Sequence, residues 1–72
     1  GLGSDTFVLS SGKGFSIVHD FEYGLDQLLI GSSDKIKTKY SNNDTLIFDG
    51  KDYLGTIFDT RLEIENKDDW MV

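Results

Sequence analysis

The sequence contains no cysteine, and this absence removes two common ways of stabilising a small domain. Without cysteine there is no disulfide and no cysteine-based zinc site. A chain of 72 residues buries only about 60% of the surface that its unfolded form exposes. Its folded state is therefore marginally stable unless a metal, a neighbouring segment or another subunit contributes.

Basic residues and long apolar runs are also scarce. Seven Lys and Arg residues against thirteen Asp and Glu give a net charge of −6. This charge opposes binding to nucleic acid or anionic membranes, because phosphate contacts are made mainly by Lys and Arg. No run of consecutive apolar residues is longer than three, far short of the roughly 20 residues of a membrane span. We expect a monomer with no nucleic-acid partner and no membrane insertion.

Few side chains are suited to catalysis. His19 is the single histidine, and Asp20 follows it directly. In an extended strand these neighbours point to opposite faces, so Asp20 would not orient His19 as a hydrolase triad requires. With one histidine and no cysteine, we do not expect an enzyme.

Alternation of apolar and polar residues predicts an all-β domain. The expected strands cover residues 15–21, 25–30, 35–40, 45–48, 51–58 and 61–65. The lysines of 35–40 suit an exposed edge strand, and Asp49-Gly50 predicts a tight hairpin turn because its central positions need positive φ. Good helix formers leave a helix as an alternative for 61–65. The aromatic residues expected in the core are Phe7, Phe15, Phe21, Phe48, Tyr53, Phe58 and Trp70.

The first nine residues combine a glycine-containing turn with an apolar extended run. Gly1 and Gly3 permit positive φ angles that bring carbonyl oxygens together, and Asp5 adds a carboxylate to the same small space. After this turn, Phe7 and Leu9 fall on one face of an extended strand. Carbonyl and carboxylate oxygens are the ligands that calcium prefers.

This opening resembles the RTX, or haemolysin-type, calcium-binding family, whose nonapeptide is G-G-x-G-x-D-x-U-x with U a large apolar residue. Gly1 matches the second glycine, Gly3 the third, Asp5 the aspartate and Phe7 the apolar position. The first glycine would lie before residue 1, so we expect a chain that begins inside the last repeat of a longer array.

Two later segments are similar to the C-terminal regions of RTX proteins such as the serralysin-type secreted proteases. Residues 17–28 are similar to the pattern I-x-D-F-x-x-G-x-D-x-[IL], with one extra residue between Ile17 and Asp20, and residues 43–47 are similar to N-D-T-x-[IL]. The resemblance implies a partial repeat over residues 1–9 and a cap over residues 10–72. The expected cap is a small antiparallel sheet or sandwich that covers the last coil of a parallel β-roll.

The resemblance also implies a calcium site. Its ligands would be Gly1, Gly3 and Asp5, with Asp20 and Asp26 as further candidates. Because the family completes each ion between neighbouring coils, we expect this chain alone to bind Ca²⁺ weakly. Asp20 and Asp26 also lie near a turn, where an aspartate ordinarily accepts backbone N–H groups, so both roles are open.

The chain ends in Asp69-Trp70-Met71-Val72, one acid followed by three apolar residues. In serralysin-type proteins, a pattern of this kind is the C-terminal signal read by an ABC-type exporter in type I secretion. The resemblance therefore implies a secreted, extracellular protein. The alternative is a chain end whose Trp70 packs on the sheet.

The expected function is a calcium-binding C-terminal module of a secreted RTX-type protein. It would cap the β-roll, contact the upstream repeats and carry the secretion signal. The alternative is a β-sandwich module that binds carbohydrate or protein and has no calcium role. Such a module needs an exposed aromatic strip on one face of a sheet. The activity of the upstream parent is left open by this sequence.

Overall fold

The computed structural model describes residues 3–9, 14–30 and 35–72, and these residues form mainly β-structure. The all-β class predicted from the sequence is confirmed. Within these ranges no helix is long and apolar enough to cross a membrane. In chain order the elements are β1 (Thr6–Leu9), β2 (Ser16–Val18), β3 (Gln27–Ile30), β4 (Ile36–Ser41), β5 (Asp44–Asp49), β6 (Asp52–Ile57), the 3₁₀ turn η1 (Ile64–Asn66) and α1 (Lys67–Trp70).

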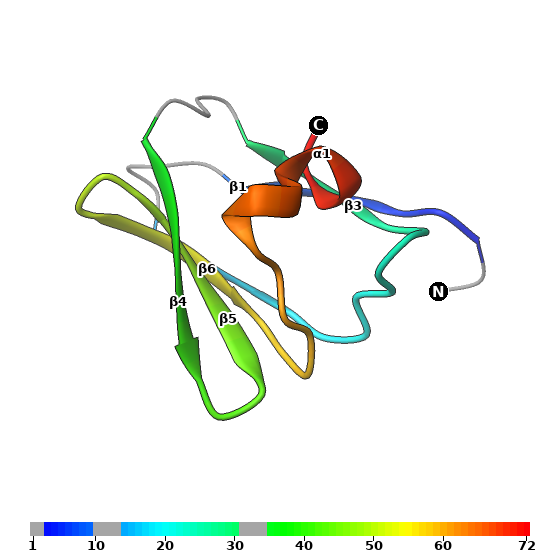
Figure 1. The fold of residues 1–72 in the computed structure, drawn as a ribbon, viewed down its shortest axis with the longest axis horizontal. Helices are drawn as coiled ribbons and strands as arrows, with labels where there is room; N and C mark the ends of the chain where they lie inside the picture. The colour runs from blue at the N-terminus through cyan, green and yellow to red at the C-terminus, as the bar shows by residue number, and fades with distance from the viewer. Residues whose placement is uncertain (1–2, 10–13, 31–34) are drawn as a thin grey trace.

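The larger sheet has the strand order β2-β6-β5-β4. Figure 1 labels three of these strands, β6, β5 and β4. Strands β4, β5 and β6 pair antiparallel through two consecutive hairpins. Strand β4 lies at one edge, as predicted for the lysine-containing segment. The predicted tight hairpin is confirmed, but its turn lies one residue later, at Gly50 and Lys51, because Asp49 pairs with Asp52. Of the two predicted central residues, only Gly50 has a positive φ, of 61°.

Two strand pairings are parallel, which the sequence did not predict. Strand β1 pairs with β3 in a two-stranded sheet, and β2 pairs with β6 at the end of the larger sheet. The chain thus leaves β1, contributes β2 to the other sheet and then returns to β3. Alternation shows which face of a strand is buried, but it carries no information about the direction of the neighbouring strand.

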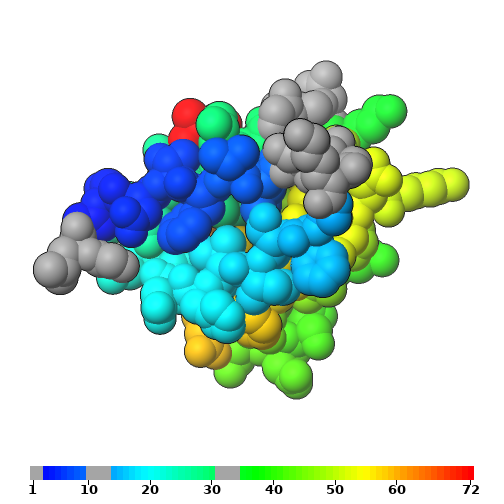
Figure 2. Space-filling model, turned by 180° about the vertical axis from the view of Figure 1, so that it is seen from behind, coloured from blue at the N-terminus to red at the C-terminus, as the bar shows by residue number. Residues whose placement is uncertain are grey.

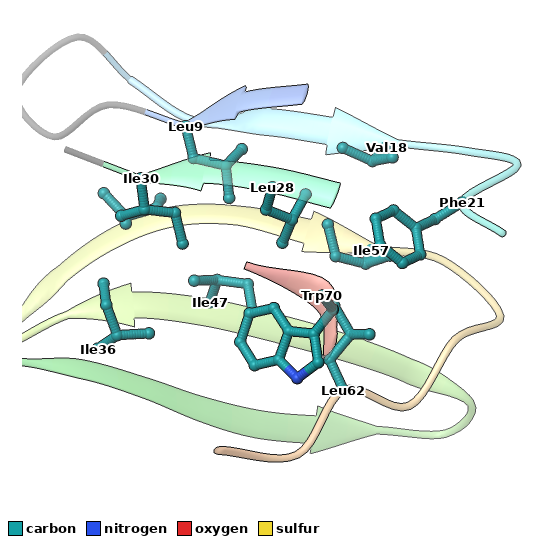
Figure 3. Close-up of a cluster of buried hydrophobic side chains, with 11 residues drawn as sticks. Leu9, Val18, Phe21, Leu28, Ile30, Ile36, Ile47, Ile57, Leu62 and Trp70 are labelled. Carbon is teal, nitrogen blue, oxygen red and sulfur yellow. The ribbon is translucent and has the colours of Figure 1, made fainter. Parts of the chain in front are cut away.

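The core lies between the two sheets and is closed by the C-terminal segment (Figure 3). Leu9 and Leu28 come from the small sheet, while Ile47 and Ile57 come from the large one. These four residues and Trp70 are all fully buried. Residues from the beginning, middle and end of the chain therefore share one core.

The strand predicted over residues 61–65 is wrong. This segment has no strand and runs into η1 and α1. Its backbone binds side chains instead of a neighbouring strand: the Leu62 N–H donates to Thr45 Oγ1 at 3.0 Å, and the Glu63 carbonyl accepts from Trp70 Nε1 at 2.9 Å. The segment consequently does not extend the sheet, and of its five residues only Leu62 is buried.

The aromatic residues divide between the core and the opposite face of the large sheet. Phe21 and Trp70 are buried, as predicted. Phe15 is 61% exposed, so its predicted place in the core is wrong. Phe15 contacts Tyr53, and Tyr53 contacts Phe48, on the face away from the core. The remaining aromatic residues of the predicted set, Phe7 and Phe58, are half-buried, like Phe48 and Tyr53.

Candidate functional site

The turn before β1 is attached directly to the beginning of β3. Gly3 has a φ of 102°, in the region that favours glycine. Two residues later, the Asp5 N–H donates to Asp26 Oδ1 at 2.9 Å, and the Asp5 carbonyl accepts from the Gln27 N–H at 2.9 Å. These bonds set the parallel register in which Thr6 lies beside Gln27.

The carboxylate of Asp26 holds this junction together from inside. Asp26 is 1% exposed, and its second oxygen, Oδ2, accepts from the Glu22 N–H at 2.8 Å. The hydrogen bonds from Glu22 and Asp5 favour the charged carboxylate and lower the pKa of Asp26, against an opposing effect of burial. Asp26 thereby joins the turn after β2 to the turn before β1.

We expect the stability of the domain to depend on the charge of Asp26. Because its pKa is lowered in the folded state, the carboxylate contributes stability that is present above its unfolded-state pKa, near 3.8. That stability is lost as the pH falls through the folded-state pKa. Asp26→Asn places an amide NH₂ where a backbone N–H requires an acceptor, so it should destabilise the fold at neutral pH and flatten the acid part of the stability profile.

Urea unfolding monitored by the fluorescence of Trp70, from neutral to acidic pH, measures both effects. Asp68→Asn is the matched control, since Asp68 is an exposed acid in α1. If Asp26→Asn and Asp68→Asn kept the same stability and the same pH dependence, the role assigned to Asp26 would be wrong.

The five predicted calcium ligands do not form one cluster of side chains. Gly1 lies outside the described residues, Gly3 and Asp5 are exposed, and Asp20 is exposed with a φ of 61°. Among the residues that the structure describes, no three His, Cys, Asp or Glu side chains gather to hold a metal ion. Calcium takes six to eight oxygens. Gly3 and Asp5 alone do not supply a shell of this size.

The small sheet is closed on one side and open on the other. On the closed side, Leu28 of β3 bridges to Met71 in parallel, and its carbonyl accepts from the Val72 N–H at 2.8 Å. On the open side, no strand in the described part of the chain pairs with the far edge of β1. Val8 and Leu29, which are neighbours in the register, are 60% and 42% exposed.

The four residues of the predicted secretion signal are part of the folded domain. Trp70 is fully buried and Met71 packs against the core, whereas Val72 is exposed. Asp69 Oδ2 accepts from the Tyr23 hydroxyl at 3.1 Å. Desolvation, together with this hydrogen bond and the Asp69 charge, raises the pKa of Tyr23. Trp70 thus packs in the core between the sheets, and the secretion signal stays a prediction.

No family model, curated protein or solved structure matches this chain. Its function is therefore inferred from its own residues and their arrangement.

Sequence reasoning missed the open edge of β1. Val8, an apolar residue at the outward position of a strand whose inward positions are Phe7 and Leu9, reports on the outer face of β1 and not on its edge. An apolar residue at an outward position indicates that both faces of a strand meet other groups. Without the direction of β3, however, the side on which a further strand could lie was not evident.

Proposed function

We propose that this chain caps the end of a parallel β array, and that a strand of the preceding coil pairs with the open edge of β1. The supporting observation is the parallel pairing of β1 with β3 directly after the Gly3–Asp5 turn. A turn followed by a short strand in parallel register is the repeating unit of stacked β-coils. In this proposal β1 is the last coil strand, and β3 is the strand of the cap that pairs with it.

The backbone of β1 has groups available for such a neighbour. The Asp5 carbonyl binds β3, and successive residues of a strand direct their backbone groups to alternate sides. The N–H and C=O groups of Thr6 and Val8 therefore point to the open edge. An upstream strand would satisfy these groups and cover part of the exposed Val8 side chain, as in strand addition to any open sheet edge.

Calcium enters the proposal as the ion that orders the junction. Gly3, through its carbonyl, and Asp5, through its carboxylate, would supply part of the shell, and the preceding coil would supply the rest. Bound calcium contributes a positive charge that draws oxygen ligands of both turns together. Asp26 supports this arrangement by holding the Asp5 backbone in place.

The proposal places the chain in a secreted protein that carries a type I signal at Asp69–Val72. Because Trp70 is buried in the folded domain, an ABC-type exporter would have to read these residues before the domain folds. Low cytoplasmic calcium would keep the upstream repeats unfolded until export. A cap at the end of the array then prevents fraying and edge-to-edge aggregation outside the cell.

The test compares this chain with a version extended before Gly1 by several consensus G-G-x-G-x-D-x-U-x repeats. We expect amide NMR during calcium titration to show that the N–H groups of Thr6 and Val8, which point to the open edge, become protected in the extended chain only. Val8→Pro removes an edge N–H without altering the groups that face β3. It should abolish this protection and leave the isolated domain folded, whereas Val8→Ala should retain the protection. If the amide signals of residues 3–9 in the extended chain did not change with calcium, the proposal would be contradicted.

A further inference from the structure

The face of the large sheet opposite the core carries aromatic and basic side chains. The ring centroids of Phe15 and Tyr53 are 5.1 Å apart, and those of Tyr53 and Phe48 are 5.5 Å apart. Lys39 Nζ lies 5.2 Å from the Phe48 ring centroid. Figure 2 shows the chain leading into β2 at the surface beside the β5–β6 hairpin. We call this surface, formed by Phe15, Lys37, Lys39, Phe48, Lys51 and Tyr53, the lysine–aromatic face.

A groove of about 300 Å³ crosses this face next to the edge strand β4. It is lined by Lys37, Lys39, Phe48, Gly50 and Lys51. Its floor is apolar, its rim is basic, and its lining includes no acid. None of the three lysines has an ion-pair partner among the described residues. A chain with a net charge of −6 thus gathers three of its seven basic residues around one apolar groove.

The spacing of the lysines suits one kind of anionic partner. Lys37 and Lys39 are two residues apart on β4, so they emerge on the same face at a separation of roughly 6.6 Å. Any other extended strand has the same period, and acids at alternate positions would meet both lysines. No neighbour among the described residues pairs with the outer edge of β4. The repulsion between the two lysines would be relieved by such a partner.

We propose that the edge of β4 binds an extended acidic peptide segment whose alternate carboxylates pair with Lys37 and Lys39. Pairing with the β4 backbone supplies the main-chain hydrogen bonds. Phe48, on the floor of the groove, contacts Tyr53 of β6, and Tyr53 in turn contacts Phe15 in the segment before β2. This surface is distinct from the β1 edge, which lies in the other sheet.

The probe is a short synthetic peptide that alternates glutamate and valine, titrated into the full chain by NMR. We expect the amide shifts to concentrate on residues 36–41. Lys37→Glu and Lys39→Glu should each weaken binding about fivefold, because each replaces a surface ion pair by repulsion. Lys67→Glu, which makes the same charge change on exposed α1, should leave binding unchanged. Trp70 fluorescence shows that each variant is folded.

The spacing requirement has its own control, a peptide of the same composition with all glutamates consecutive. We expect it to bind more weakly. Equal binding of the two peptides, or no binding of either, would overturn the proposal. A single-stranded oligonucleotide or an acidic polysaccharide that bound as tightly and lost affinity in the same variants would also overturn it, in favour of a general polyanion surface.

Discussion

Trp70→Ala is expected to unfold the domain. Trp70 is completely buried between the sheets, and its indole Nε1 donates to the Glu63 carbonyl at 2.9 Å (Figure 3). Truncating a buried tryptophan to alanine costs about 3–5 kcal/mol. A hydrophobic core of this size rarely contributes more than about 3–5 kcal/mol of net stability. The loss therefore equals the whole stability of the domain.

Far-UV circular dichroism during heating and the dispersion of amide NMR signals measure this outcome. Val72→Ala is the control at the same chain end. The Val72 side chain is 62% exposed, and its N–H still donates to Leu28 in the variant. Trp70→Phe should be intermediate, because it retains much of the packing but removes the indole donor, so the Glu63 carbonyl keeps only its hydrogen bond from the Asn66 N–H. Cooperative melting of Trp70→Ala at the wild-type temperature would refute the role assigned to Trp70.

Gly55→Ala is expected to separate β2 from the large sheet. A Cβ atom at Gly55 would meet the Ser16 carbonyl oxygen well inside van der Waals contact, with the Ser16 carbonyl carbon and nitrogen also close. These are backbone atoms, so no side-chain rotation relieves the overlap. Gly55 is also the register partner of Ser16 at the start of the parallel pair.

The consequence reaches the core, because β2 carries Val18, which is 4% exposed. Overpacking of this kind costs about 3 kcal/mol, or more where the backbone has to move. Hydrogen exchange should accelerate at residues 16–18, and the urea midpoint should fall. Ser16→Ala is the control, since it changes the partner side chain and leaves the close backbone contact intact. An unchanged midpoint in Gly55→Ala would show that the two strands can move apart freely.

The local parts of the fold were predictable from the sequence. Asp49-Gly50 and its flanking alternation specified the β5–β6 hairpin, because a tight turn joins strands that are adjacent in the chain. The lysines of β4 marked an edge, because charged residues at alternate positions face solvent. The strand predicted over residues 61–65 was wrong, because Leu62 is the one buried residue of this segment. The backbone groups of Leu62 and Glu63 bind side chains instead of a neighbouring strand.

The candidate sites show the same division. Asp26 was identified as a residue of interest from its place beside a turn, but its two backbone donors lie four and 21 residues away. From the sequence, the residues of the lysine–aromatic face were assigned to different places: the lysines of β4 were predicted at a sheet edge, and Phe15 was predicted in the core. Only the pairing of β2 with β6 and of β5 with β4 brings these side chains onto one surface.

By itself, the sequence determined the all-β class, the hairpins and the edge strand, because these depend on alternation and turn residues within a few positions. The tertiary structure decided the two parallel pairings, the burial of Trp70 and the bonds that engage Asp26. Each of these features joins segments that are far apart in the chain. Which segments meet depends on how all the apolar faces pack together in one core. Local sequence patterns indicate which residues are buried, but only the assembled core shows which residues those buried residues contact.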